Sequence, residues 1–293
     1  MHKNLKILVT GANGQLGSEI FSRSKKDHNN YYFTDIQQLN LTDFNAVDEY
    51  IKEINPDVII NCAAYTAVDM AENEQDLAMS VNVNAVNNLG IIAKNNNITI
   101  IHISTDYVFD GRSYLPYTEL DEPNPISVYG YTKLLGENAL IESGCNGVII
   151  RTSWLYSTYG QNFFNTISRL ANTRSDISIV FDQIGTPTFA GHLADAIIKI
   201  IPQLETTDGM SIYHFSNEGV CSWYDFATEI ANLLNFQMKI YPIHSEEYPT
   251  TAQRPFYSLL DKSKIKNSFG IEIPHWRKGL LECVEGNYSK INF

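Results

Sequence analysis

Short, mainly apolar runs alternate along the first half of the chain with longer segments in which apolar residues recur every three or four positions. The runs have the length of buried strands and are found at 5–10, 31–35, 57–62 and 99–104. The longer segments have helical periodicity and are found at 43–54, 76–95 and 127–142. Because strands that alternate with helices form parallel sheets, this pattern predicts an α/β fold with a Rossmann-type doubly wound sheet.

After residue 150 the pattern changes, because helical segments with an apolar face dominate. These segments are 162–173, 190–201 and 223–234. They cannot all belong to the nucleotide-binding half, so we predict two regions. Residues 1–150 are expected to form a dinucleotide-binding domain, and residues 151–293 a smaller C-terminal α/β lobe that is mainly substrate-binding and returns to the sheet. A small-molecule cleft is expected between them.

Composition and charge exclude several partners. The 293 residues carry a formal net charge of −12, whereas nucleic acids and anionic membranes are bound by basic surfaces. No apolar run is long enough to span a bilayer, and the chain passes from Met1 into its first strand without a charged and apolar leader. The four cysteines are far apart and form no CxxC pair. We therefore predict a cytoplasmic enzyme that binds neither nucleic acid nor membrane.

A glycine-rich turn, GANGQLG, follows the first strand and leads into a helical segment. In such a strand–turn–helix unit, backbone N–H groups and the positive end of the helix dipole receive a pyrophosphate. The GxxGxxG spacing is similar to the fingerprint of short-chain and extended short-chain dehydrogenases. Cofactor contacts are expected from Gly11, Asn13, Gly14, Gln15, Leu16 and Gly17.

The second strand ends at Asp35, whose carboxylate can accept hydrogen bonds from an adenosine ribose. No Arg or Lys lies between Ile36 and Leu41 to bind a 2′-phosphate. We expect the cofactor to be NADPH or NADH, and this arrangement favours NADH.

Tyr129 and Lys133 are four residues apart in a predicted helix, so their side chains lie on one face. A nearby ammonium favours ionisation of a phenol, and we expect Lys133 to make Tyr129 a stronger acid. An isolated YxxxK is more often an incidental pair on a surface helix. Here Thr105 follows the fourth strand at the sheet edge where ligands bind, so all three side chains border one crevice. We predict that Thr105 binds a substrate carbonyl, Tyr129 delivers a proton, and Lys133 also binds the nicotinamide ribose.

Two further residues have alternative interpretations. Trp154 offers a flat apolar platform for a sugar ring, but it can also be a core tryptophan. Arg254 can clamp a diphosphate with its planar guanidinium, but it can also form a surface ion pair.

Several longer motifs carry a more specific resemblance. They are TAVD at 66–69, STDYVFDG at 104–111, YGYTK at 129–133, RTSWLY at 151–156, DQIGTPT at 182–188 and RP at 254–255. From residue 5 to residue 284 the chain resembles dTDP-4-dehydrorhamnose reductases. The resemblance implies reduction of the 4-keto group of dTDP-4-dehydro-β-L-rhamnose by NADPH or NADH, the final step of dTDP-L-rhamnose synthesis.

The resemblance also implies specific contacts. It adds Asn40, Leu41, Ala63, Ala64 and Tyr65, together with Tyr129 and Lys133, to the cofactor site. It places Val68, Asp69, Thr105, Asp106, Tyr107, Tyr129 and Trp154 at the substrate. Arg254 joins the substrate residues through the clamp described above.

Two positions depart from the family pattern. Asn40 stands where the family often has an acidic residue at the adenosine end of the cofactor. Some members bind magnesium across a dimer through acidic residues, of which Glu19 matches one, whereas Gly191 stands where another is expected. We accordingly assign no metal site, and the chain is expected to be a monomer or a homodimer.

Two other functions remain open at this point. A nucleotide-sugar epimerase or dehydratase of the same superfamily would recycle a bound cofactor instead of consuming it. A non-catalytic regulatory subunit with this fold would lack turnover, and the intact set of Thr105, Tyr129 and Lys133 argues against it.

Overall fold

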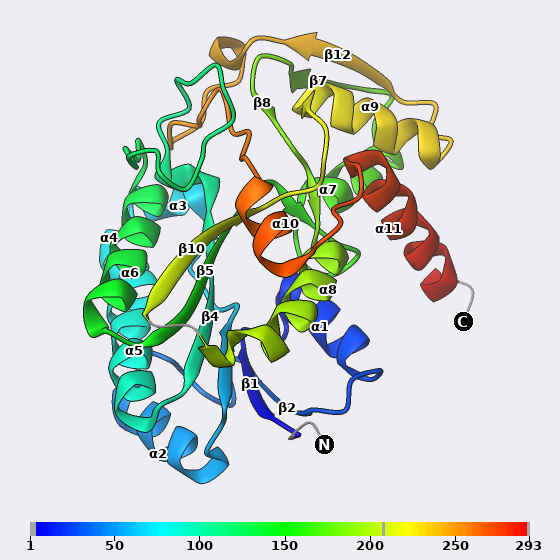
Figure 1. Ribbon diagram of the computed structural model, residues 1–293. Helices are drawn as coiled ribbons and strands as arrows, with labels where there is room; N and C mark the ends of the chain where they lie inside the picture. The colour runs from blue at the N-terminus through cyan, green and yellow to red at the C-terminus, as the bar shows by residue number, and fades with distance from the viewer. Residues whose placement is uncertain (1–3, 207–208, 292–293) are drawn as a thin grey trace.

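A six-stranded parallel sheet forms the centre of the molecule, which is seen here as a computed structural model that describes residues 4–206 and 209–291 (Figure 1). Residues 1–3, 207–208 and 292–293 belong to the two predicted regions but lie outside the described residues. The strand order is β10-β5-β4-β3-β1-β2, and every neighbouring pair is parallel. The predicted doubly wound parallel sheet is confirmed.

The sheet strands are β1 (Lys6–Thr10), β2 (Asn30–Thr34), β3 (Val58–Asn61), β4 (Thr99–Thr105), β5 (Asn146–Thr152) and β10 (Met210–Phe215). The helices around the sheet are α1 (Gln15–Ser24), α2 (Phe44–Ile54), α3 (Val68–Ala71), α4 (Gln75–Met79), α5 (Ala85–Asn96), α6 (Val128–Ser143), α8 (Ala190–Ile200) and α10 (Ser263–Phe269).

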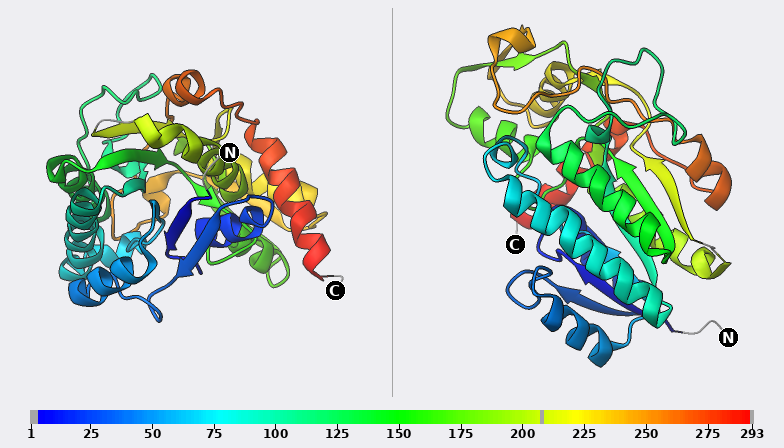
Figure 2. Two further views of the ribbon diagram at one scale, coloured as in Figure 1. Left: turned by 60° about the horizontal axis from the view of Figure 1, so that its bottom comes forward. Right: turned by 90° about the vertical axis from the view of Figure 1, so that its left-hand side faces the viewer.

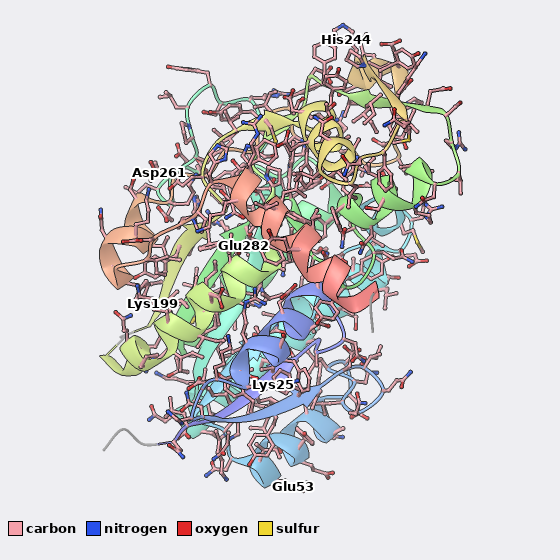
Figure 3. All side chains as sticks on the ribbon, turned by 90° about the vertical axis from the view of Figure 1, so that its right-hand side faces the viewer. Lys25, Glu53, Lys199, His244, Asp261 and Glu282 are labelled. Carbon is pink, nitrogen blue, oxygen red and sulfur yellow. The ribbon has the colours of Figure 1, made fainter. Side chains whose placement is uncertain are left out.

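Alternate residues of each strand feed two separate cores, because successive side chains point to opposite faces of a sheet. Leu8 and Ile59 pack with α2, α5 and α6, the helices seen in front in the right-hand view of Figure 2. Val9 and Ile60 pack with α1, α8 and α10 on the other face, where Figure 3 shows α1 and α8 side by side. Since both faces are covered, the strands read as continuous apolar runs.

The segment predicted as one helix over 76–95 is interrupted. A π-helical turn, Ser80–Asn84, separates α4 from α5 and leaves Asn82 fully buried. Asn82 Oδ1 accepts a hydrogen bond from Tyr65 N, and Asn82 Nδ2 donates to Tyr65 O and to Thr132 Oγ1. Asn82 therefore ties this turn to the backbone of Tyr65, which lines the cleft. The prediction of a continuous α-helix is wrong, because a π-helical turn interrupts the segment.

A second layer of structure lies beyond the upper end of the sheet in Figure 1. Its main elements are α7 (Phe163–Ala171), β7 (Asp176–Val180), α9 (Trp223–Leu233), β12 (Lys239–Ile243) and α11 (Trp276–Ile291). Its two-residue strands are β6 (Leu155–Tyr156), β8 (Ile184–Gly185), β9 (Thr188–Phe189) and β11 (Cys221–Ser222). A separate core that includes Tyr156, Phe164, Phe226 and Trp276 holds these elements together. In contrast, β10 extends the central sheet and α8 covers it, so the chain crosses between the two layers after residue 150.

None of the helices in the described part of the chain is long and apolar enough to cross a membrane.

Candidate active site

A cleft with a volume of about 940 Å³ opens at the carboxyl ends of β1, β3, β4 and β5. This is the edge at which open parallel sheets bind ligands. The predicted cofactor residues that line it are Gly11, Asn13, Gly14, Gln15, Leu16, Gly17, Asp35, Asn40, Leu41, Ala63, Ala64, Tyr65, Tyr129 and Lys133. The predicted substrate residues that line it are Val68, Thr105, Asp106, Tyr107, Tyr129, Trp154 and Arg254. Of the predicted residues only Asp69 is outside this lining.

The glycine-rich turn requires its glycines for steric reasons. Gly11 has a φ of +65°, and a Cβ there would come within 2.7 Å of Ala63 N. A Cβ on Gly17 would lie 2.4 Å from Gly11 O, which is closer than side chains approach backbone. The helix α1 begins directly after Gly14, so its first N–H groups have no intrahelical partner. Together the bare turn and the free donors form a cradle that fits a dinucleotide pyrophosphate.

Asp35 lines the cleft and is also hydrogen-bonded to the glycine-rich turn. Its Oδ2 accepts a hydrogen bond from Asn13 N at 2.8 Å, and its Oδ1 accepts one from Ile36 N at 2.8 Å. A carboxylate oxygen has two lone pairs, so both bonds leave room for further donors. The nearby Asn40 is exposed, and its Oδ1 accepts hydrogen bonds from the backbone N and the hydroxyl of Thr42.

Helix α6 brings Tyr129 and Lys133 to the cleft. Ser127 begins this helix, because its hydroxyl accepts a hydrogen bond from Gly130 N at 3.2 Å. A Cβ on Gly130 would lie 2.1 Å from Tyr107 O, so glycine permits close contact with the segment after β4. The last residue of β4 is Thr105, whose hydroxyl donates a hydrogen bond to Asp106 Oδ1 at 3.1 Å and lies near the Tyr129 phenol.

The expected effect of Lys133 on Tyr129 is wrong for this structure. Burial is the largest influence on the Tyr129 phenol and raises its pKa well above 10, against a smaller lowering by the Thr105 hydrogen bond. Lys133 Nζ instead donates to Ile103 O at 2.7 Å and lies 3.3 Å from His102 Nε2. Tyr129 therefore stays protonated at neutral pH and can serve as a donor.

Asp106, Tyr107 and Arg254 line the cleft beside Thr105 and form a polar cluster. Burial raises the pKa of the Asp106 carboxyl to about 6, although hydrogen bonds from Ser258 and Thr105 oppose the shift. The Tyr107 ring contacts the Tyr129 ring edge to face, with centroids 5.5 Å apart. Arg254 reaches this group as the partner of Asp69, with 2.7 Å between Nη2 and Oδ2. The ion-pair interpretation of Arg254 is thus correct, and the pair stands beside the cleft.

Trp154 lies between the cleft and the packed interior of the second layer. Its indole lines the cleft, while one face is covered by Trp223. Its backbone φ is +47°, an uncommon conformation for a residue with a side chain. A Cβ on Gly185 would lie 2.5 Å from Trp154 Cε2, so this glycine leaves space for the indole.

Comparison with known proteins identifies the family. The family described as "RmlD substrate binding domain" matches residues 5–289. A dTDP-4-dehydrorhamnose reductase of Aggregatibacter actinomycetemcomitans is 40% identical over 285 residues, which cover 94% of this chain and 97% of the relative. The chain belongs to the dTDP-4-dehydrorhamnose reductase family.

Solved structures agree with this assignment. A dTDP-4-dehydrorhamnose reductase from Clostridium acetobutylicum is 41% identical, with a TM-score of 0.93 over 97% of this chain and 100% of that one. The enzyme from Bacillus anthracis, in complex with NADP, is 37% identical, with a TM-score of 0.93 and the same coverage. A UDP-glucose 4-epimerase from Thermus thermophilus shares the fold at 17% identity, with a TM-score of 0.83, 96% of this chain and 98% of that one being covered.

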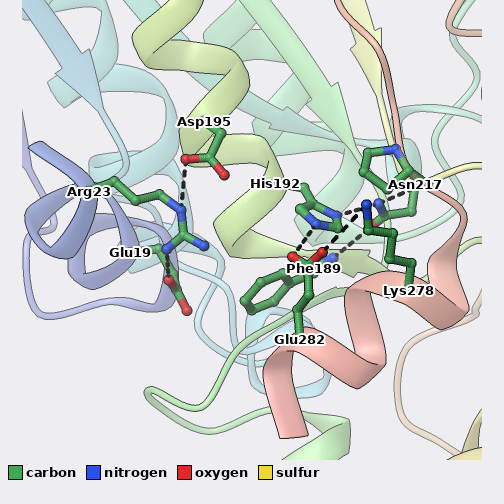
Figure 4. Close-up of polar contacts among 9 residues, drawn as sticks. Glu19, Arg23, Phe189, His192, Asp195, Asn217, Lys278 and Glu282 are labelled. Carbon is green, nitrogen blue, oxygen red and sulfur yellow. Dashed lines mark hydrogen bonds and ion pairs between the residues drawn. The ribbon is translucent and has the colours of Figure 1, made fainter. Parts of the chain in front are cut away.

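In this dTDP-4-dehydrorhamnose reductase family member, the residues around Glu19 do not fit a magnesium site (Figure 4). Glu19 Oε2 accepts a hydrogen bond from Arg23 Nη1, and Glu19 Oε1 accepts one from the Ser157 hydroxyl at 2.6 Å. Arg23 Nε also contacts Asp195 at 2.9 Å. A Cβ on Gly191 would lie 2.1 Å from Arg23 Nη2, so the guanidinium occupies the space beside this glycine. Within the described residues, no group of three or more His, Cys, Asp or Glu side chains is placed to hold a metal ion.

Several lining residues of the family's cleft were not predicted from the sequence. They include Thr42, Leu77, Val81, Gly160, Asn162 and Trp223. Most come from loops or from the interrupted helix, where no periodicity points to a ligand. Trp223 had a usable signal, because it is a tryptophan at the start of a predicted helix, next to a polar Ser222 cap.

Proposed function

We propose that this protein is a dTDP-4-dehydrorhamnose reductase that reduces the 4-keto group of dTDP-4-dehydro-β-L-rhamnose to dTDP-β-L-rhamnose with NADPH or NADH. The observation that carries the proposal is that Thr105, Tyr129 and Lys133 line one cleft together with a bare glycine turn. Relatives of similar length that are called dTDP-4-dehydrorhamnose reductases support the choice of sugar.

We assign the cofactor side and the substrate side of the cleft to different regions of the chain. Residues 1–150 bind the dinucleotide, with the predicted cofactor residues along the glycine turn, the ends of β2 and β3, and α6. Residues 151–293 supply much of the substrate side, including Trp154 and Arg254. The ion pair between Asp69 and Arg254 links the two regions, and it supports a role of the guanidinium in binding the sugar diphosphate.

When bound, the reduced dinucleotide supplies a hydride to C4 of the sugar. Thr105 hydrogen-bonds the keto oxygen and orients it toward Tyr129. Tyr129 then donates its phenolic proton to the alkoxide that forms at that oxygen. Lys133 lies on the same helix face one turn away and is positioned to bind the nicotinamide ribose.

For the cofactor we keep both reduced dinucleotides in the proposal. The Bacillus anthracis relative was solved with NADP, which supports NADPH. Asp35 at the end of β2 favours NADH, because a carboxylate repels a 2′-phosphate. Asn40 is neutral where family members are often acidic, so it adds no repulsion.

The decisive experiment incubates the protein with dTDP-4-dehydro-β-L-rhamnose and either NADH or NADPH. Loss of reduced cofactor, together with one equivalent of dTDP-L-rhamnose, is expected. An epimerase or dehydratase would convert the sugar without net consumption of cofactor, and a regulatory subunit would do neither. No consumption with either cofactor would overturn the proposal.

The choice between monomer and homodimer, and the cytoplasmic location, remain predictions from the sequence. Sedimentation of the purified protein with and without a chelator tests the first of these. An unchanged mass is expected, because Arg23 already neutralises Glu19 and Asp195.

A further inference from the structure

A row of buried polar side chains crosses the sheet beneath the cleft. Thr10 on β1 lies opposite Asn61 on β3, and Asn61 lies opposite His102 on β4. Lys133 reaches the end of this row from α6. All four residues are at most 1% exposed, and buried polar atoms of this kind are almost always hydrogen-bonded.

The backbone fixes the orientation of the Asn61 amide. Ala63 N donates a hydrogen bond to Asn61 Oδ1 at 3.2 Å, and a backbone N–H can only donate. Thr10 Oγ1 donates to the same oxygen at 2.7 Å. The other end of the amide is therefore the NH₂ group, which can only donate. It lies 3.1 Å from His102 Nδ1.

The tautomer of His102 follows from this orientation. Because Asn61 Nδ2 donates to it, Nδ1 of the ring must be the acceptor. The imidazole is neutral, since burial, the largest influence, holds the pKa of His102 well below 6.5. A neutral ring with a bare Nδ1 carries its proton on Nε2. That N–H faces Lys133 Nζ at 3.3 Å.

An ammonium group cannot accept this hydrogen bond, because it has three donors and no lone pair. A free amine can accept from His102 Nε2–H while it donates to Ile103 O at 2.7 Å. The hydrogen-bond row thus has one fully satisfied state. In that state Lys133 is uncharged.

We propose that His102 is a positioning residue whose Nε2–H favours the free-amine form of Lys133 in the ligand-free enzyme, so that Lys133 takes up a proton when the reduced dinucleotide binds. The second half rests on the proposed function. An anionic dinucleotide whose ribose hydroxyls face Lys133 favours the ammonium form, since it supplies negative charge and acceptors.

The other groups around Lys133 agree with a readily titrated lysine. Burial lowers the pKa of Lys133 to about 8, while Glu137 and Cys62 act in the opposite direction. Glu137 lies one turn further along α6, where the buried Arg151 forms an ion pair with it at 2.6 Å. Cys62 follows β3, and burial keeps its thiol protonated by raising its pKa to about 12. Tyr129, one turn earlier, is neutral as well, because burial raises the pKa of its phenol.

The first test uses the ligand-free wild-type protein. Long-range ¹H–¹⁵N correlation spectra report which imidazole nitrogen carries the proton, and ¹³C-labelled lysine reports the titration of Lys133. We expect a proton on His102 Nε2 and a titration of Lys133 near pH 8. A proton on Nδ1, or a Lys133 that titrates near its ordinary value of 10.5, would overturn the proposal.

Variants separate this role from simple packing. His102→Phe keeps a ring but removes the donor, so the pKa of Lys133 should rise by about 0.5 to 1 unit, the shift that one net hydrogen bond produces. His192→Gln is the control, because His192 lies on α8 across the sheet and should leave Lys133 unchanged. Equal titration of Lys133 in wild type and in folded His102→Phe would contradict the proposal. If His102→Phe does not fold, the wild-type tautomer still decides.

The second test is calorimetry of NADH and NADPH binding at pH 8 in two buffers with different ionisation heats. We expect the wild type to take up a fraction of one proton on binding, and Lys133→Met to take up none. Binding without proton uptake would overturn the coupling. If neither dinucleotide binds, the proposed function fails and the coupling fails with it, whereas the ligand-free spectra decide the role of His102 separately.

Discussion

The indole of Trp154 lies flat against the indole of Trp223, with ring centroids 3.7 Å apart and an angle of 10° between the planes. Trp223 is itself supported by Phe163, whose ring centroid is 4.6 Å away. One face of Trp154 is therefore fixed by packing, and the indole has only its other side and its edge to offer to the cleft. A stack of this kind holds a sugar platform rigid at little entropic cost on binding.

Trp154→Ala should lower kcat/KM for the sugar nucleotide while cofactor affinity stays unchanged. Loss of one aromatic platform costs about 1 to 3 kcal/mol, which is roughly a 5- to 150-fold decrease. Steady-state kinetics combined with cofactor titration by fluorescence measures both quantities. An unfolded Trp154→Ala protein would instead favour the core interpretation of this residue.

Gly185→Ala is the matched variant for the same platform. The added methyl would clash with Trp154 Cε2, so the indole must move although it remains present. We expect a loss of sugar-nucleotide kcat/KM that approaches that of Trp154→Ala, with unchanged cofactor affinity. Wild-type kinetics in this variant would show that the position of the indole does not matter.

NADH should be accepted at least as well as NADPH, because Asp35 borders the cleft and no cation follows it before residue 41. Asp35→Asn should then improve NADPH use more than NADH use, since only NADPH places a phosphate near the removed charge. The comparison is kcat/KM for both cofactors in both proteins. A wild-type preference for NADPH above about 100-fold, or about 2.7 kcal/mol, would mean that Asp35 does not face the ribose.

The free energy of unfolding should depend on pH because of the titration of Asp106. The pKa of this carboxyl is about 6 in the folded protein, above its ordinary value of 3.8, because the side chain is buried. The folded protein thus favours the protonated carboxyl. The resulting contribution of Asp106 to the free energy of unfolding is fully present below about pH 4 and is lost as the pH rises through about 6. At pH 7 the buried charge costs up to about 3 kcal/mol.

Asp106→Asn should consequently be more stable than wild type at pH 7 and about equally stable at pH 4. Urea unfolding of the two proteins at both pH values measures the difference. The same variant is expected to lose substrate affinity, because Asp106 lines the cleft beside Thr105. A pH-independent difference in stability would show that the carboxyl is ionised to the same extent in the folded and unfolded chains.

The sequence was sufficient for the sheet and for most of the cleft, because both depend on local patterns. The strands ending at Thr10, Asn61 and Thr105 are largely buried and mainly apolar, and the glycine spacing indicates the turn that follows the first of them. The parallel topology then places the carboxyl ends of these strands at one edge of the sheet. At that edge Thr105 lies near Tyr129.

What could not be predicted depends on burial and on distant partners. The electrostatic relation of Tyr129 and Lys133 came out wrong because spacing on a helix says nothing about desolvation or about the carbonyl of Ile103. The stack of Trp154 on Trp223 joins residues far apart in the chain, and no periodicity indicates it. The π-helical turn at Ser80–Asn84 contains Asn82, whose bonds to Tyr65 join residues 17 positions apart and are not visible in a sequence window.

Tyr129→Phe should lower turnover by roughly 100- to 10,000-fold, the range for loss of one general acid. Phe keeps the ring and its edge-to-face contact with Tyr107, so folding and cofactor affinity should be preserved. Because burial keeps Tyr129 protonated, removal of its hydroxyl takes away the proton itself and not merely a charge. Thr105→Val should act more mildly through lost orientation of the keto oxygen. Lys133→Met should lower turnover at least as much as Tyr129→Phe and also weaken cofactor binding. Single-turnover kinetics with deuterated cofactor would locate the defect, and near wild-type turnover in a folded Tyr129→Phe protein would assign the proton to another donor.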